Sequence, residues 1–161
     1  RTMGDPVLRG KSKAVDKIDD GILTLAQDMI DSINTGYQEG IGLAAPQIGV
    51  SKRVIVINLD EDIKVYINPE LETIDKDIEM EEEGCLSVPH LKAEVPRKKK
   101  IRVKALNLNS EKIELEASGI LARVFQHEVD HLDGVLFVDR LDKKTKRHLL
   151  FEYNSQQKQE E

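Results

Sequence analysis

Two histidines and a glutamate late in the chain have the spacing of a metal-dependent hydrolase. Residues 126–131 read Q-H-E-V-D-H, which contains the pattern H-E-x-x-H. Residues four apart lie one above the other on an α-helix, so His127 and His131 would point two imidazoles at one spot. Glu128 stands beside the first histidine, where its carboxylate can take a proton from water on a metal ion. The pattern also occurs by chance, so the rest of the chain must supply a third ligand.

The third ligand that the sequence offers is Cys85, the one cysteine of the chain. The downstream pattern H-x-x-G-x-x-H of many metalloproteases is absent, and His148 falls on a separate polar helix. One thiolate and two imidazoles leave a fourth position open for water, which is the ligand count of catalytic zinc sites. The plain alternative is a small buried hydrophobic residue without a role. A free nucleophilic thiolate is disfavoured, because three acids at 81–83 disfavour an anion beside them.

Length and composition predict one globular domain over residues 1–161. Charged residues make up 34% of the chain and apolar residues 39%, and the net charge of −6 argues against a general nucleic-acid binder. The apolar runs are too short for a transmembrane helix, and no signal-peptide pattern is expected. A single cysteine excludes an internal disulfide and fits a reducing compartment.

The elements that must position these residues follow from the apolar spacing. A helical stripe predicts a first helix over 19–35, capped by Asp19 or Asp20 and stopped at 34–36. β-branched runs predict strands at 53–59 and 63–67, the second ended by Pro69. Strand-like segments lie at 93–96 and 99–108, followed by a half-exposed hairpin partner. Ser118 is the expected cap of the helix that carries the histidines, and an extended segment is expected at 135–138. A last, mostly polar helix is predicted over 143–154, with a frayed tail from Ser155.

A segment of small residues precedes the first predicted strand. Residues 40–49 read G-I-G-L-A-A-P-Q-I-G. Small residues let the backbone come close to another group, and glycine reaches φ values that other residues avoid. The segment is not a phosphate loop, because no Gly-Lys-Ser/Thr follows, and the dinucleotide-binding pattern does not fit either. Alone, it is typical of a tight turn.

Three stretches together resemble one family, the peptide deformylases. Residues 40–47 (G-I-G-L-A-A-P-Q) resemble its first motif, residues 83–87 (E-G-C-L-S) its second, and residues 126–132 (Q-H-E-V-D-H-L) its third. The segments at 5–9 and 136–140 are similar to the family's flanks, so the resemblance covers nearly the whole chain. The extreme N-terminus is irregular, and His90 departs from the pattern. We expect His90 in a loop near the cleft entrance and not as a ligand.

The resemblance implies an enzyme that removes the N-formyl group from the starting methionine of newly made polypeptides and releases formate. It also implies an α+β fold, in which antiparallel β-sheets surround a central helix that carries H-E-x-x-H. An N-terminal and a C-terminal helix complete this fold. The order predicted above, with strands before the central helix and one helix on either side of it, agrees with it.

Within the site, the resemblance assigns a role to each motif. The two histidines and the cysteine would hold the metal, and Glu128 would take the proton from water and pass it to the leaving amine. The Leu86 backbone N–H and the Gln47 side-chain amide would stabilise the charge that grows on the formyl oxygen. Arg97 is expected to pair with Glu83 and hold the cysteine loop, although an ordinary surface arginine is the plain alternative.

Substrate contacts are expected from the first motif and from the helix of the histidines. By resemblance, Ile41 and Gly42 would present backbone groups to a peptide that binds as an extended strand. Ile41, Ile120 and Val124 are candidates to line the methionine pocket. Ordinary core residues are an equal alternative for these three.

The metal and the partners are expected as follows. A site of one cysteine and two histidines suits zinc on chemical grounds. The resemblance implies one divalent ion per chain, with Fe²⁺ as the native ion and Zn²⁺, Ni²⁺ or Co²⁺ in purified samples. N-formylmethionyl peptides and nascent chains are the expected partners of a monomer without membrane contact, in the bacterial cytoplasm or an organelle. A basic stretch could contact ribosomal RNA or simply form a solvated helix face; it comprises Lys143, Lys144, Lys146 and Arg147.

The residues alone leave three other classes open. A zinc endopeptidase of the H-E-x-x-H type predicts cleavage of unformylated peptides and a third ligand other than Cys85. A metal-stapled binding module predicts a closed four-ligand site, in which Glu128 has no purpose. A nucleophile pair of Cys85 and a histidine conflicts with the acids before the cysteine. Formate release from a formyl-Met dipeptide, with and without chelator, separates these classes.

Overall fold

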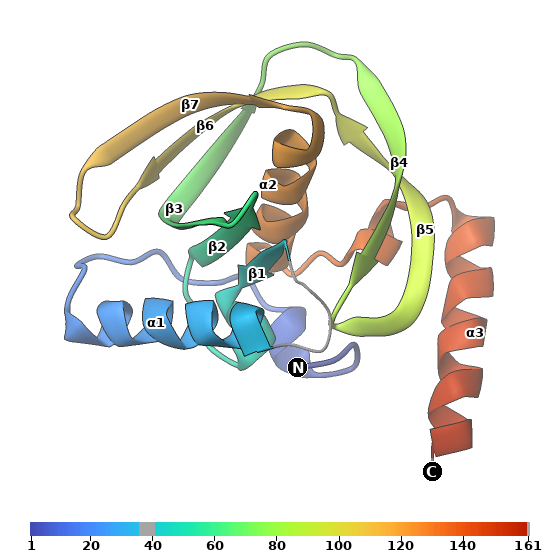
Figure 1. The fold of residues 1–161 in the computed structure, drawn as a ribbon. Helices are drawn as coiled ribbons and strands as arrows, with labels where there is room; N and C mark the ends of the chain where they lie inside the picture. The colour runs from blue at the N-terminus through green and yellow to red at the C-terminus, as the bar shows by residue number, and fades with distance from the viewer. Residues whose placement is uncertain (36–40, 161) are drawn as a thin grey trace.

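The computed structural model describes residues 1–35 and 41–160 of the chain (Figure 1). Its α-helices are α1 (Asp20–Thr35), α2 (Gly119–Leu132) and α3 (Lys143–Glu160), and 3₁₀ helices span Pro6–Leu8, Ala45–Ile48 and Phe137–Arg140. The strands are β1 (Gly42–Ala44), β2 (Val54–Leu59), β3 (Asp62–Thr73), β4 (Ile78–Cys85), β5 (Val88–Lys98), β6 (Lys100–Leu106) and β7 (Lys112–Ser118). These strands pair antiparallel throughout, so the predicted α+β class is confirmed.

A five-stranded sheet in the order β1-β2-β3-β6-β7 lies between α1 and α2. Successive residues of a strand point to opposite faces. On β2, Val54 and Val56 pack in the core cluster of α1, whereas Ile55 and Ile57 pack in that of α2. This strand is apolar in its buried part because both of its faces are covered. β1 lies at one edge of the sheet, beside the site described below.

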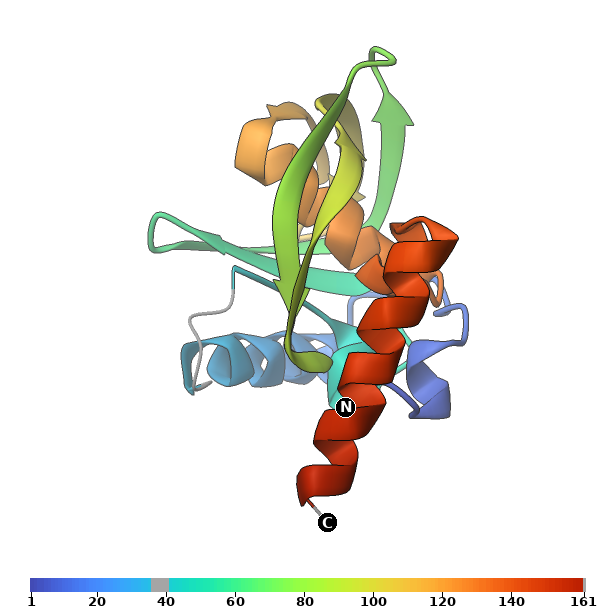
Figure 2. The same ribbon diagram turned by 90° about the vertical axis from the view of Figure 1, so that its right-hand side faces the viewer.

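The hairpin β4-β5 forms a second, two-stranded sheet and carries Cys85 at the end of β4. Figure 2 shows α3 alongside this hairpin. The side chains between them form a third apolar cluster, which also includes the 3₁₀ helix after α2; its buried members include Leu8, Val88, Leu91, Val95, Phe137, Leu149 and Tyr153. The metal-binding candidates therefore come from two separately packed parts of the fold.

The helix starts agree only in part with the predicted caps. The Asp19 carboxylate accepts a hydrogen bond from the Ile22 N–H at 3.1 Å and caps α1, as predicted. Ser118 is the N-cap residue of α2, as predicted, but its side chain makes no cap hydrogen bond with the described chain. α2 begins at Gly119, whose φ of +61° turns the chain from β7 straight into the helix. The predicted stop of α1 at Gly36 lies outside the described residues.

Two predicted strand boundaries are wrong. β3 continues past Pro69 to Thr73, because its pairing with β6 shifts between Ile67 and Glu70. Pro69 lies in this bulge, where a residue without an N–H is tolerated. β5 begins at Val88, ahead of the predicted segment 93–96, because it pairs with β4 along most of its length.

The C-terminal part also differs from the prediction. The expected extended segment at 135–138 ends in the 3₁₀ helix Phe137–Arg140, which is held by a hydrogen bond from the Leu136 N–H to Asp139. α3 continues to Glu160, beyond the predicted helix end at 154, so residues 155–160 are helical. Within residues 1–35 and 41–160, no helix combines the length and the apolar character needed to cross a bilayer.

Candidate metal centre

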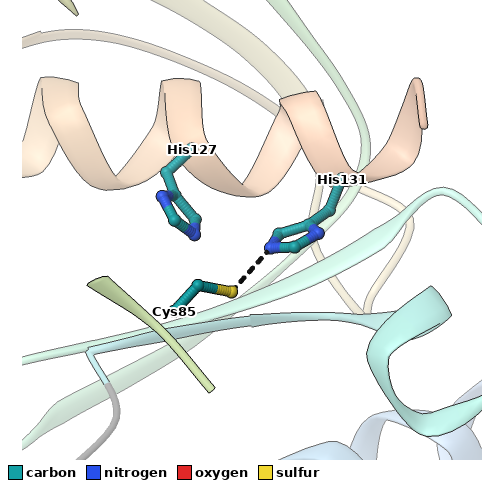
Figure 3. A group of neighbouring side chains, drawn as sticks. All are labelled: Cys85, His127 and His131. Carbon is teal, nitrogen blue, oxygen red and sulfur yellow. Dashed lines mark hydrogen bonds between the residues drawn. The ribbon is translucent and has the colours of Figure 1, made fainter. Parts of the chain in front are cut away.

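The structure brings together the side chains of Cys85, His127 and His131 (Figure 3). The sulfur and one nitrogen of each ring lie within 4.8 Å of one another, and Cys85 Sγ is 3.3 Å from His131 Nε2. In a tetrahedral zinc site, bonds of about 2.3 Å to sulfur and about 2.0 Å to nitrogen place these atoms about 3.5 Å apart. The donor set and its spacing therefore fit a single divalent metal ion.

The two histidines are held by the packing of α2. The opposite face of the helix is buried against the five-stranded sheet, where Phe125 meets Tyr66 edge-on with ring centroids 4.8 Å apart. His127 and His131 stand one turn apart, with ring centroids 5.1 Å apart. Phe137 stacks on the His127 ring at 6.2 Å and is fully buried itself. Packing on the sheet thus fixes the helix, and Phe137 also fixes the His127 ring.

Cys85 reaches the histidines from the tip of the β4-β5 hairpin. The Ser87 N–H lies 3.4 Å from Cys85 Sγ, and Gln47 Nε2 lies 3.6 Å from it. Both groups donate toward the sulfur. The cysteine end of the hairpin is therefore held against the loop of Gln47.

Glu83 orients His127 from behind. Its Oε1 atom lies 2.8 Å from His127 Nδ1, so the proton on that nitrogen points to the carboxylate and Nε2 is left for a metal. Arg97 donates to both oxygens of Glu83 at 2.9 and 3.0 Å, which confirms the predicted pair. Burial raises the pKa of Glu83, but the hydrogen bonds from His127 and Arg97 outweigh it and lower the pKa to about 2. Glu83 is therefore an anion at neutral pH.

The remaining titratable groups respond to burial and to each other. Burial lowers the pKa of His127, but its hydrogen bonds to Cys85 and Glu83 raise it to about 10. Burial, and then the charge on His127, hold the pKa of His131 well below its ordinary value. A metal ion bound between the two rings would displace a proton from His127, because a ring nitrogen can bind a metal only when it carries no proton.

Glu128 lies in a closed space beneath β1. It is 2% exposed, and its Oε1 atom is 4.0 Å from His131 Nε2 without a hydrogen-bond partner among the described residues. A Cβ atom at Gly42 would lie only 2.6 Å from Glu128 Oε2. The small residues of the first motif thus do let the backbone approach another group. Burial raises the pKa of Glu128 to about 7.

Gln47 is held by its own loop with its amide turned toward the cysteine. Its Oε1 atom accepts a hydrogen bond from the Ala44 N–H at 2.9 Å, and its Nε2 atom donates to Ser87 Oγ at 3.2 Å. The side chain is almost fully buried. Because the carbonyl oxygen is already engaged, the N–H groups of this amide are the part that points into the site.

The expected substrate residues lie in different surroundings. Ile41 is 45% exposed and Ile120 is 65% exposed, so neither is an ordinary core residue. Val124 is half-buried and packs on the core cluster of α2. Leu86 lies in the exposed turn of the hairpin, next to Cys85. His90 stands exposed on β5 with a φ of +67°, and the loop position expected for it is wrong.

Comparison with known proteins decides the family. A family model described as polypeptide deformylase matches residues 1–147, with all of the site residues inside the match. The chain belongs to the peptide deformylase family.

Similar proteins and similar solved structures agree with that match. The peptide deformylase of Natranaerobius thermophilus is 51% identical over 143 residues, which cover 88% of this chain and 90% of that one. The crystal structure of peptide deformylase from Thermus thermophilus superposes with a TM-score of 0.88 at 42% identity and covers 96% of this chain and 92% of its own. The peptide deformylase from Synechococcus elongatus in complex with actinonin gives a TM-score of 0.89 at 40% identity, with coverage of 96% and 84%.

Sequence reasoning missed two charged residues behind the site of this deformylase. Arg123 donates to Glu83 at 2.5 Å, and its position four residues before His127 on one helix face was the available signal. Asp130 accepts a hydrogen bond from Arg97 at 2.6 Å. Asp130 lies inside the H-E-V-D-H run, but nothing local connects it with an arginine on a distant strand.

Proposed function

We propose that Cys85, His127 and His131 hold the one divalent metal ion with which this peptide deformylase works. The enzyme is a metal-dependent hydrolase that removes the N-formyl group from nascent polypeptides. The observation that carries the assignment is the convergence of one sulfur and two ring nitrogens within 4.8 Å. A metal held by three protein ligands would keep a fourth position for water or the formyl oxygen, as catalysis requires.

Glu128 is the proposed proton carrier of the reaction. A metal held by the three ligands would act as a Lewis acid toward the formyl oxygen and make water in the site more acidic. Glu128 takes a proton from the attacking water and returns it to the nitrogen that leaves as formate is released. Its burial beside His131 supports this role, because a dry carboxylate with a free oxygen holds and transfers a proton over a short distance.

Gln47 and Leu86 are the proposed donors to the oxygen that becomes negative. The Gln47 amide is fixed by Ala44 so that its N–H groups face Cys85, and a donor that is already oriented loses no energy by reorienting during the reaction. Leu86 follows Cys85 in the hairpin turn, so its backbone N–H lies next to the ligand. Loss of one such donor typically lowers the rate by about 10²–10³-fold.

The formylated peptide is proposed to bind along the free edge of β1. This strand closes one side of the five-stranded sheet, and an added strand pairs through backbone groups such as those of Ile41 and Gly42. Ile41, Ile120 and Val124 are proposed to line the methionine pocket. The exposure of the first two supports this role, because large apolar side chains left in water at a site are available to a ligand.

The metal identity is a separate proposal. We propose Fe²⁺ as the native ion on the family resemblance, with Zn²⁺, Ni²⁺ or Co²⁺ able to occupy the same ligands after purification. A thiolate with two imidazoles binds all four ions, and the later metals bind more tightly. Iron can therefore be the native ion only if the supply of metal ions in the cell, and not their affinity alone, determines which ion is bound.

We further propose that residues 1–161 act as one catalytic domain and as a monomer in the bacterial cytoplasm, with an organelle as the alternative. Contact with the ribosome is proposed through α3, on which Lys143, Lys144 and Arg147 are exposed, whereas Lys146 pairs with Asp139 at 2.9 Å. Cosedimentation with ribosomes tests this proposal. If this face of α3 is simply solvated, the protein should not cosediment with ribosomes.

Formate release from a formyl-Met dipeptide tests the proposed site. We expect turnover by the purified enzyme, loss of turnover with chelator, recovery on adding back a divalent ion, and loss in Cys85→Ser. A zinc endopeptidase would instead cleave unformylated peptides and keep its metal without Cys85. Formate release that persists in Cys85→Ser with full metal content would refute the ligand assignment.

A further inference from the structure

Buried charges join the Cys85 hairpin to α2. The hairpin is a sheet of its own, so its distance from the helix is not fixed by pairing with the larger sheet. The Arg97 side chain on β5 is 3% exposed and lies between Glu83 on β4 and Asp130 on α2. We infer that Arg97 is a positioning residue, which fixes the cysteine hairpin against α2 and holds His127 in its metal-binding orientation. This inference rests on the metal ligands proposed above.

Arg97 acts on His127 through Glu83. Glu83 Oε1 accepts from Arg97 Nη2 at 3.0 Å and lies 2.8 Å from His127 Nδ1, so one oxygen serves both side chains. Glu83 Oε2 accepts from Arg97 Nε at 2.9 Å and from Arg123 at 2.5 Å. The planar fork of the arginine fixes the plane of the carboxylate. A fixed carboxylate in turn fixes the rotation and the tautomer of the histidine ring.

The third nitrogen of the same guanidinium reaches α2. Arg97 Nη1 donates to Asp130 Oδ2 at 2.6 Å, and Arg140 donates to both oxygens of Asp130 at 3.0 and 2.8 Å. Asp130 immediately precedes the ligand His131 on the helix. One side chain therefore contacts the strand before Cys85 and the helix turn of His131. A lysine has a single charged nitrogen on a flexible stem and cannot hold both carboxylates in this geometry.

A purely structural ion pair makes a different prediction. Buried ion pairs are weak evidence for stability, because the cost of removing charges from water offsets much of their attraction. If Arg97 only stabilised the fold, its loss would lower the free energy of unfolding and leave metal binding by the folded protein unchanged. Because one Glu83 oxygen contacts both Arg97 and His127, we expect instead that a folded protein without Arg97 binds metal less tightly than the wild type.

The test compares Arg97→Lys with the matched control Arg102→Lys. Arg102 lies on β6 and pairs with exposed Glu72, Glu114 and Glu116, so the same substitution there removes a fork without touching the hairpin. The Co²⁺ affinity of each full-length protein is measured by competition with a chelator, and the folded fraction is followed by circular dichroism under the same conditions. We expect Arg97→Lys to weaken Co²⁺ binding about 10- to 100-fold at an unchanged folded fraction. The kcat of its Co²⁺-loaded form should fall with little change in KM, whereas Arg102→Lys should match the wild type.

Wild-type Co²⁺ affinity in folded Arg97→Lys would overturn the inference, even if the variant unfolds more easily. If Arg97→Lys does not fold, Asp130→Asn replaces it, because that change keeps the Glu83 pair and weakens the charged hydrogen bonds of Arg97 and Arg140 to α2. A smaller loss of affinity in the same direction supports the inference, and wild-type affinity overturns it. Cys85→Ser in the same assay separates the positioning role from the ligand set. Unchanged Co²⁺ binding there refutes the ligand set itself, whereas unchanged binding in Arg97→Lys alone refutes only the positioning role.

Discussion

The two elements that meet at the metal centre are held in place by different forces. α2 packs its apolar face on the five-stranded sheet, and side chains such as Phe125 and Leu132 are fully buried there. The β4-β5 hairpin shares a smaller apolar cluster with α3 and is tied to α2 by buried charges around Arg97. Apolar packing is strong but has little directional preference, whereas charged hydrogen bonds are directional.

This difference separates what stabilises the fold from what sets the positions of the metal ligands. The sheet side contributes most of the burial that keeps α2 folded, and it presents both histidines at once because they share one helix face. The hairpin side supplies a single ligand, and its placement depends on angles as well as on contact. We therefore expect changes in the apolar core to affect mainly the free energy of unfolding, and changes behind the ligands to affect mainly metal binding.

The largest expected effect is on the reaction itself. Glu128→Gln keeps the size of the side chain and removes its ability to carry a proton, so kcat should fall about 10²–10⁴-fold while metal content stays at the wild-type level. Formate release and metal analysis of the same sample measure both. Retained activity would show that Glu128 is not the proton carrier.

Two buried phenylalanines sharpen the comparison directly. Phe125 lies in the sheet core and Phe137 in the hairpin cluster, where it stacks on the His127 ring. Each change to alanine should lower the free energy of unfolding by about 3–5 kcal/mol, as measured by urea denaturation. Only Phe137→Ala should also weaken the metal affinity of the folded protein. Equal losses of affinity in the two variants would contradict the separation of the two sides.

Gly42→Ala tests how closely β1 covers the proton carrier. The added Cβ would lie 2.6 Å from Glu128 Oε2, so the carboxylate or the strand must move. A displacement of about 1 Å at a reacting group can lower a rate about 10²-fold. We expect such a loss of kcat with unchanged metal content. A fully active variant would show that β1 yields and that Glu128 keeps its position.

The smallest effect is expected at the surface of the hairpin side. Burial raises the pKa of Asp139, but hydrogen bonds from Arg9 and Lys146 outweigh it and hold the pKa below its ordinary value of 3.8. Because the folded-state pKa is the lower one, the ionised carboxylate stabilises the fold above pH 3.8, and this contribution is lost as the pH falls through the folded-state value. Asp139→Asn should therefore cost about 1 kcal/mol or less at neutral pH. The difference from wild type should shrink below pH 3.8 in urea titrations.

The helix of the histidines could be predicted because its signal is local. Spacings of three and four residues define one face, and they place His127 and His131 together without knowledge of the fold. The same reasoning gave α1 and a cap at Asp19 or Asp20, and in the structure Asp19 is the cap. It failed at Pro69, where pairing with β6 carries the strand through a bulge. It placed the cap of α2 correctly at Ser118, but no side-chain hydrogen bond forms there within the described chain.

The partners of the site could not be predicted in this way because they are distant in sequence. Cys85 was selected by chemistry and by its motif, since nothing local links it to a helix much later in the chain. The pair of Arg97 and Asp130 joins a strand to a helix, and only the tertiary arrangement brings these charges together. Local reasoning therefore finds which residues can act, and the fold decides which of them meet.

X-ray absorption spectroscopy of the zinc-loaded enzyme tests the shared metal site most directly, because it counts the atoms bound to the metal. We predict one sulfur at about 2.3 Å and two imidazole nitrogens at about 2.0–2.1 Å, with the sulfur lost in Cys85→Ser. A wild-type spectrum without sulfur, or one that Cys85→Ser leaves unchanged, would contradict the claim that a metal joins the hairpin to the helix.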